Sequence, residues 1–229
     1  MEIRFKDISA MDDKLVNTSL PLLSMHGTSL YRDFFKRGLD ILFAILSAPI
    51  ALPILAVVAL LVRRDGSTPF YRQLRVGKNG KEFSILKVRT MVPDADSRLA
   101  EYLDENPLAK REWETTQKLK DDPRITSIGR LLRKSSIDEL PQLWNVFLGD
   151  MSLVGPRPMM VDQKELYPGL AYYELRPGIT GPWQVSDRNE TTFAERAKYD
   201  TTYYSSLSFK TDLGILGRTI GVVLRCTGY

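Results

Sequence analysis

Residues 133–158 read RKSSIDELPQLWNVFLGDMSLVGPRP, and the rest of the chain is organised around this stretch. Pro141 cannot lie deep inside a helix, because its ring clashes with the carbonyl group four residues earlier. A helix that contains Pro141 therefore begins only a few residues before it, with Ser136 or Asp138 as N-cap, and Gly149 is a suitable end. Apolar residues at helical spacing between these points predict one buried face: Leu140, Leu143, Trp144 and Phe147.

Two adjacent carboxylates, Asp138 and Glu139, stand at this predicted helix start. In one interpretation they only stabilise the helix, with Ser136 and Glu139 as a capping box and Asp138 in the favourable field of the helix dipole. In the other they carry chemistry, because cations lie on both sides, at Arg133 and at Arg157 between two prolines. A carboxylate in that setting stays ionised and can act as a nucleophile. The segment alone leaves both interpretations open.

Length and composition indicate one globular domain. The chain has 229 residues, of which 43% are hydrophobic and 26% charged, and this is enough to bury a core. The net charge of +4 and the pI near 9.1 suit an anionic partner, but no nucleic-acid-binding motif is present. Phosphates or anionic lipids are the better candidates. With one cysteine, Cys226, and one histidine, His26, the sequence contains neither an intrachain disulfide nor a Cys/His metal cluster.

Residues 39–62 are almost wholly apolar and are flanked by basic pairs at 36–37 and 63–64. As a straight helix of about 36 Å they could span a bilayer core of about 30 Å. Pro49 and Pro53, next to Ser47, interrupt that helix, and basic residues at both ends favour the cytoplasmic side for each end. The residues alone support a kinked span and a re-entrant hairpin about equally. Residues 1–35 form a leader that predicts little.

The remaining residues, 65–229, predict a compact domain, so that the fold class is α+β and mainly helical. Asn79 and Gly80 join strands at 69–76 and 81–91 into a β-hairpin, in which Lys87 and Arg89 share one face. This face is either a solvated basic edge or a site for phosphates. The other expected elements are exposed helices at 94–120, an amphipathic segment at 122–133, a loop of turns at 174–186, and helices at 193–204 and 213–224.

Two segments of the central stretch, SSIDELPQLWNV and GDMSLVGPRP, resemble the signature of the bacterial sugar transferases, the monotopic phosphoglycosyl transferases of the short form. The loop at 174–186 is similar to the same family, and the resemblance covers roughly residues 36–229. One departure is Asp187, where the family usually has glycine before Arg-Asn, and this acid puts the local loop shape in doubt. The resemblance implies that residues 36–64 form a re-entrant membrane helix broken at the Ser/Pro element.

The resemblance also implies an enzyme of the bacterial inner membrane whose catalytic domain faces the cytoplasm. It would transfer a phosphosugar from a nucleotide diphosphate sugar, expected to be a UDP-sugar, to undecaprenyl or another polyprenyl phosphate, and so start the synthesis of an exopolysaccharide or other surface glycan. Two rivals remain: a membrane-anchored interaction protein without activity, and a metal-dependent phosphohydrolase. The oligomeric state is left open, and a homodimer is one alternative.

By the same resemblance, Asp138 attacks the phosphate that bears the sugar and forms an aspartyl phosphosugar, while Glu139 holds Mg²⁺. The ion is expected because an anionic nucleophile that approaches a diphosphate is repelled unless charge is neutralised. The candidates for contact with substrate are Lys87, Arg89, Arg133, Arg157 and Asp200, the last in the place of an acid in the family's pattern.

Overall fold

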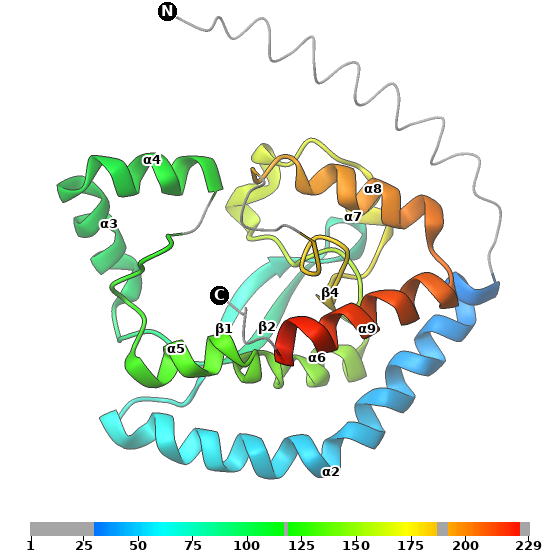
Figure 1. Cartoon of the computed structure of the whole chain (residues 1–229), viewed down its shortest axis with the longest axis horizontal. Coiled ribbons are helices and arrows are strands. Elements are labelled where there is room, and N and C mark those ends of the chain that lie inside the picture. The colour runs from blue at the N-terminus through cyan, green and yellow to red at the C-terminus, as the bar shows by residue number, and fades with distance from the viewer. Residues whose placement is uncertain (1–29, 117–118, 187–191, 225–229) are drawn as a thin grey trace, which may run out of the picture.

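A long apolar helix, α2 (Lys36–Val62), forms one side of the molecule in this computed structural model, which describes residues 30–116, 119–186 and 192–224. A π-helical turn (Tyr31–Phe35) leads into it and a 3₁₀ turn (Arg63–Asp65) follows it. Regular structure thus begins five residues before the end of the predicted leader, most of which lies outside the described residues. Figure 1 shows α2 bent near its middle, and the helix contains Pro49 and Pro53. The predicted break is a bend in a continuous helix.

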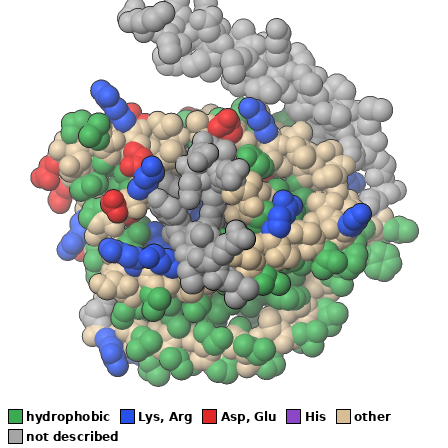
Figure 2. Space-filling view, in the orientation of Figure 1, with side chains coloured by type: hydrophobic (Ala, Val, Ile, Leu, Met, Phe, Trp, Pro, Cys, Tyr) green, Lys and Arg blue, Asp and Glu red, His purple; other side chains and the backbone are tan. Residues whose placement is uncertain are grey.

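Both ends of α2 pack on the globular part of the chain. Near the start, Asp40 accepts a hydrogen bond of 3.0 Å from the backbone N–H of Leu153. At the other end, Val58 and Val62 belong to a buried cluster with Val88 and Leu132. The middle of the helix instead exposes large apolar side chains, including Leu46, Ile50 and Leu52. Figure 2 shows hydrophobic side chains gathered along the lower side of the molecule, over this helix.

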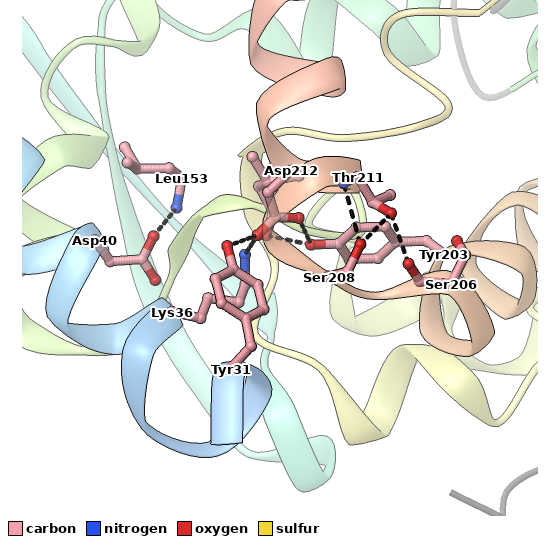
Figure 3. A network of polar contacts seen from close by, with 10 residues as sticks. Tyr31, Lys36, Asp40, Leu153, Tyr203, Ser206, Ser208, Thr211 and Asp212 are labelled. Atoms are coloured by element: carbon pink, nitrogen blue, oxygen red, sulfur yellow. Dashed lines mark hydrogen bonds and ion pairs between the residues drawn. The ribbon is translucent and has the colours of Figure 1, made fainter. Parts of the chain in front are cut away.

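A buried polar network ties the start of α2 to the start of α9 (Phe209–Leu224). The Asp212 carboxylate accepts hydrogen bonds from the hydroxyls of Tyr31 (2.8 Å) and Tyr203 (2.5 Å) and pairs with the ammonium of Lys36 (2.6 Å) (Figure 3). Both charged side chains are largely buried, at 13% and 6% exposed for Lys36 and Asp212. The pair is satisfied because two hydroxyls occupy the remaining acceptor sites of the carboxylate.

Asp212→Ala is expected to destabilise the protein by about 3–5 kcal/mol, because it removes the ion-pair partner of the buried Lys36 ammonium. In a chain of this size this lowers the melting temperature by about 10 °C, measurable by thermal unfolding of the purified protein in detergent. Glu82→Ala is the matched control, since its ion pair with Lys164 is exposed and contributes little. Equal shifts for both variants would contradict a structural role for the network.

The predicted β-hairpin is present. Strands β1 (Phe70–Val76) and β2 (Glu82–Val88) pair antiparallel, with Gln73 opposite Ile85. The turn between them holds Asn79 and Gly80 at φ values of 58° and 73°, a left-handed backbone that these two residue types adopt readily. The second strand ends at Val88, three residues before the predicted boundary at 91.

A second, two-stranded sheet was not predicted. Strand β3 (Ser152–Val154) pairs parallel with β4 (Gly178–Thr180), which lies in the segment expected to be a loop. Glycine is required at the crossing, because a Cβ built on Gly155 would lie 2.2 Å from the carbonyl oxygen of Arg176. Each strand has only three residues, too few to show a periodic pattern, and this explains why the sequence does not reveal them.

Helices cover the two small sheets (Figure 1). The predicted exposed pair is α3 (Ala95–Glu105) and α4 (Pro107–Thr116), and the amphipathic segment contains α5 (Ser127–Lys134). The helix expected at 193–204 is α8 (Arg196–Ser206), and the one expected at 213–224 is α9. Shorter elements are α6 (Gln142–Leu148), α7 (Ala171–Glu174) and 3₁₀ turns at Ile137–Glu139 and Val161–Leu166.

The buried face of α6 agrees only in part with the one predicted from its apolar residues, since Leu143 packs against the core but two others do not. Trp144 and Phe147 are 56% and 42% exposed, whereas Gln142, Asn145 and Val146 are buried. Asn145 explains the difference, because its side-chain amide accepts from the N–H of Leu86 and donates to a carbonyl of the same strand, at 3.0 and 2.8 Å. The side chain of Asn145, which forms hydrogen bonds with the backbone of β2, is therefore buried where the apolar pattern predicted a hydrophobic side chain.

Candidate active site

The central stretch folds as a chain of short turns rather than one capped helix. Helix α5 ends at Lys134, Ser136 has a left-handed backbone (φ 56°), and a 3₁₀ turn then carries Asp138 and Glu139 to Pro141 at the start of α6. The side chain of Ser136 makes no capping hydrogen bond, so the capping-box interpretation is wrong. The prediction that Gly149 ends the helix is confirmed, with φ at 96°. The turn holds the Asp138 side chain 7% exposed.

Glu139 faces the second strand of the hairpin instead of its own helix. Its carboxylate pairs with the ammonium of Lys87 at 2.7 Å, and a nitrogen of the Arg157 guanidinium lies 4.0 Å away. Two residues predicted to contact phosphates are therefore brought to the predicted acid pair from elements that are distant in sequence. The hairpin and the Pro-Arg-Pro segment approach the turn from different directions.

Burial raises the pKa of Asp138 to about 6. Lys87, Arg133 and Arg157 lower it and the neighbouring Glu139 raises it further, but loss of hydration outweighs the cations. The flanking cations favour the ionised form, as expected, but burial has the larger effect on the pKa. At neutral pH the group is still mostly ionised, and its basicity is greater than that of an exposed aspartate.

The two other predicted cations differ in position. Arg133 lies close to the acid pair, and its Nε donates to the hydroxyl of Thr90 at 2.9 Å. Arg89 instead donates to backbone carbonyls of Thr68 (2.8 Å) and Val62 (3.3 Å), so part of its guanidinium fastens the end of α2. Its predicted contact with phosphate remains a prediction.

Two arginines that the sequence analysis missed, Arg75 and Arg196, join Arg157. Arg75 donates to the carbonyl of Pro158 at 3.2 Å, and the guanidinium of Arg196 lies 4.2 Å from the ring centre of Trp183. Burial and the charge of Arg157 lower the pKa of Arg75 to about 10 and that of Arg196 to about 9. Within the part of the chain that the structure describes, the buried Nε of each has no hydrogen-bond partner. Such a cluster favours an anion with several oxygen acceptors.

Asp200 lies behind this cluster rather than beside the acid pair. It is 3% exposed and accepts a hydrogen bond of 2.6 Å from the hydroxyl of Tyr167. Burial raises its pKa to about 7, which Arg196 counteracts. It lines a small second cavity together with Arg196 and is not among the residues that line the cavity of Asp138. Asp200 is therefore placed to stabilise the charge of Arg196, and its position does not favour the predicted contact with substrate.

One large cavity, of about 1850 Å³, unites the acids and the cations. Its charged lining includes the cations Arg75, Lys87, Arg89, Arg124, Arg133, Arg157 and Arg196 and, among its acids, Asp122, Asp138 and Glu139, and its apolar lining includes residues of α2 and α9. Within the described residues, no three His, Cys, Asp or Glu side chains are grouped to hold a metal. The adjacent acids fit the mode in which Mg²⁺ takes one or two carboxylates and substrate phosphates supply further ligands.

Comparison with known proteins agrees with this arrangement. The sequence profile described as "Bacterial sugar transferase" matches residues 31–226. A UDP-galactose-lipid carrier transferase of Erwinia amylovora is 46% identical over 197 residues, 85% of this chain and 41% of the relative. An exopolysaccharide production protein, ExoY, of Sinorhizobium fredii is 46% identical over 84% of this chain and 87% of the relative. An undecaprenyl-phosphate galactose phosphotransferase of Salmonella typhimurium is 42% identical over 93% of this chain and 48% of the relative. The chain thus spans less than half the length of two of these relatives.

Proposed function

The chain belongs to the bacterial sugar transferase family, and we propose that it transfers a phosphosugar from a UDP-sugar to undecaprenyl phosphate at the membrane surface, as a first step in exopolysaccharide synthesis. The names of relatives support both substrates, since one is a UDP-galactose-lipid carrier transferase and another an undecaprenyl-phosphate galactose phosphotransferase.

The observation that carries this proposal is the placement of the buried Asp138 carboxylate in a cavity whose lining includes seven arginine and lysine side chains. A diphosphate donor brings several negative charges, and only a cationic wall lets an anionic nucleophile come close to it. The raised pKa of Asp138 also suits a nucleophile, because a more basic carboxylate attacks more readily. Arg75 and Arg196 each have a buried Nε that finds no hydrogen-bond partner among the described residues and could donate to a phosphate oxygen.

The proposed reaction has two steps. The Asp138 carboxylate attacks the phosphorus that bears the sugar, and the bond from that phosphorus to the nucleotide oxygen breaks, which releases the nucleoside monophosphate. An oxygen of the lipid phosphate then attacks the same phosphorus, frees Asp138 and leaves a polyprenyl diphosphate sugar. Lys87 and Arg157 would hold phosphate oxygens during both steps, and Glu139 sets their position through its ion pair and close approach.

Glu139, with Asp138 beside it, is the residue we expect to hold Mg²⁺ when donor is bound. The ion would neutralise charge on the diphosphate. Because Lys87 pairs with Glu139, a bound ion would share this carboxylate with the ammonium. The carboxyl groups alone are too few for a metal cage, so we expect metal and donor to bind together.

Nucleophilic attack by Asp138 predicts a specific pH dependence. A carboxyl group whose pKa is raised to about 6 gains a proton as the pH falls through that value, and the protonated form cannot attack. The kcat/KM for the donor should be constant above pH 7 and fall about tenfold per pH unit well below 6. Initial rates in a series of buffers, with tryptophan fluorescence as a check on folding, measure this. A constant rate between pH 7 and pH 5 would contradict it.

We further propose that α2 is re-entrant and that the domain faces the cytoplasm. Both ends of α2 dock on the same globular body, through Asp40 and Val62, whereas a spanning helix would carry its ends to opposite sides of the bilayer. The exposed apolar middle of the helix then dips into one leaflet.

Cysteine labelling tests this topology. In a background that lacks Cys226, Ser19→Cys in the leader and Leu108→Cys on α4, where Leu108 is 80% exposed, should both resist an impermeant maleimide in spheroplasts and react after lysis. Labelling of the leader alone in intact spheroplasts would show a true span. Replacement of Ser47 and Pro49 by leucine removes the source of the bend and should shift the leader to the outside.

The activity itself is tested by incubating the protein with a panel of nucleotide sugars, with and without undecaprenyl phosphate. The proposal predicts that at most one equivalent of nucleoside monophosphate per enzyme is released without the lipid acceptor and that continued turnover requires it. Release of many equivalents of nucleotide without acceptor would indicate a phosphohydrolase, and binding to vesicles without any turnover would indicate an interaction protein.

A further inference from the structure

The side chain of Gln184 lines the cavity that holds Asp138, and it is 6% exposed. Among the residues that the structure describes, neither its Nε2 nor its Oε1 has a hydrogen-bond partner. An unpaired amide inside a protein destabilises the fold, because the group loses its hydrogen bonds to water and gains none in return. At a cavity wall a ligand can supply the missing bonds. Both amide atoms are available for this, Nε2 as a donor and Oε1 as an acceptor.

The backbone around Gln184 is fixed close to the segment that carries Arg157. Strand β4 precedes Gln184 and pairs with β3, and the chain that leaves β3 leads to Arg157. The N–H of Gly155 donates to the carbonyl of Thr180 at 2.9 Å, so this contact continues beyond the end of β3. Trp183 lies next to Gln184, and the guanidinium of Arg157 lies 5.8 Å from its ring centre. Gln184 is therefore held on the same small body as a cation that we propose to bind phosphate.

The amide suits a different ligand group from the unpaired Nε atoms of Arg75 and Arg196. Those arginines are cationic donors and match phosphate oxygens, which only accept hydrogen bonds. A phosphate could pair with Nε2 of Gln184 but would leave Oε1 unpaired. A hydroxyl group both donates and accepts, so one or two neighbouring hydroxyls can pair with both atoms of a neutral amide. Gln184 therefore indicates a hydroxyl-bearing ligand beside the cationic wall.

We propose that Gln184 binds hydroxyl groups of the donor's hexose and thereby contributes to the choice of sugar. The inference rests on the proposed function. The hexose is attached to the phosphorus that Asp138 would attack, whereas a second phosphate separates the ribose and the uracil from that phosphorus. The hexose is therefore the hydroxyl-bearing part of the donor nearest to the reaction. A sugar that lacks the matching hydroxyl would leave the buried amide unpaired, and sites of this kind discriminate strongly against such analogues.

The test removes the amide and the hydroxyl separately and together. The donors are the UDP-hexose that the activity panel selects, for example UDP-galactose, and its monodeoxy derivatives. In the wild type, at least one derivative should have a kcat/KM about tenfold below that of the parent donor. Gln184→Met keeps the length of the side chain and removes both amide atoms, so it should lower kcat/KM for the parent about tenfold and for that derivative hardly at all. Equal losses from each missing hydroxyl in both proteins would overturn the proposal.

Gln142→Met is the matched control. Gln142 is 2% exposed, and its Nε2 likewise has no partner among the described residues, but it does not line the cavity. This variant should keep the wild-type pattern of losses across the deoxy derivatives. Loss of the same discrimination in Gln142→Met would show that the effect comes from packing and would overturn the proposal.

Donors altered in the nucleoside distinguish the hexose from the ribose and the uracil. Donors that contain 2′-deoxyuridine or N3-methyluridine should lose the same factor in kcat/KM in the wild type and in Gln184→Met. If either change instead costs the wild type activity but not the variant, Gln184 binds the nucleoside and the proposal is overturned.

Thermal unfolding gives a readout independent of turnover. Because Gln184 has no hydrogen-bond partner among the described residues, Gln184→Met should melt no lower than the wild type. If Gln184→Met does not fold, Gln184→Asn gives the same comparison, since it keeps the amide but withdraws it by one methylene. Failure of the proposed function is distinguished separately, because the wild type would then form no phosphosugar adduct with any donor. Equally fast adduct formation by the wild type and Gln184→Met would overturn only the role of Gln184.

Discussion

Asp138→Asn is expected to abolish sugar transfer, with a fall in kcat of at least about 10³-fold, because an amide cannot form the acyl phosphate intermediate. The same substitution should stop exchange of labelled nucleoside monophosphate into the donor, which requires only the first step. Asparagine has nearly the same volume as aspartate and removes the cost of burying a charge, so membrane insertion and folding should persist. Turnover at the wild-type rate would show that Asp138 only shapes the turn.

Glu139→Gln is the matched comparison, since the two acids are neighbours in one 3₁₀ turn and their side chains point about 120° apart. This variant weakens the pair with Lys87 and removes the proposed metal ligand but keeps the proposed nucleophile. We expect a fall of about 10- to 100-fold that raised Mg²⁺ partly reverses. A larger loss than for Asp138→Asn would reverse the two roles.

Removal of divalent ions should have a comparably large effect. In excess chelator both nucleotide release and adduct formation are expected to stop, because the diphosphate keeps its full charge and Asp138 is repelled. Added Mg²⁺ or Mn²⁺ should restore activity, whereas Zn²⁺ should do so poorly, because carboxylate and phosphate oxygens suit hard ions. Thermal unfolding with and without chelator serves as the control, since we expect the apo protein to remain folded. Full turnover in chelator would contradict a role for the metal.

Local backbone rules account for what the sequence predicted correctly. The Asn79–Gly80 turn and the helix end at Gly149 each depend on the φ preferences of one or two residues. The apolar run of α2 was equally evident, because length and composition alone define it. These features depend little on what packs around them.

Features that depend on tertiary contacts could not be predicted from the local sequence. The exposed face of α6 follows from Asn145 and its bonds to β2, and the raised pKa of Asp138 follows from burial that flanking residues do not reveal. Arg75 and Arg196 come from a strand and a helix far from the acids and carry no motif. The sequence signal that could have revealed Arg196 is Trp183, an aromatic residue in a Gly/Pro-rich segment. The guanidinium of Arg196 lies over its ring.

The central claim is that Asp138 carries the phosphosugar between donor and acceptor, and mass spectrometry tests it most directly. Protein incubated with donor and Mg²⁺ but no lipid, then quenched and digested, should contain a peptide spanning residues 137–142 heavier by one phosphosugar, with the added mass on Asp138. The adduct should disappear when undecaprenyl phosphate is added before the quench and should be absent from Asp138→Asn. An adduct on Glu139, or product formation by the Asp138→Asn variant at the wild-type rate, would contradict the account.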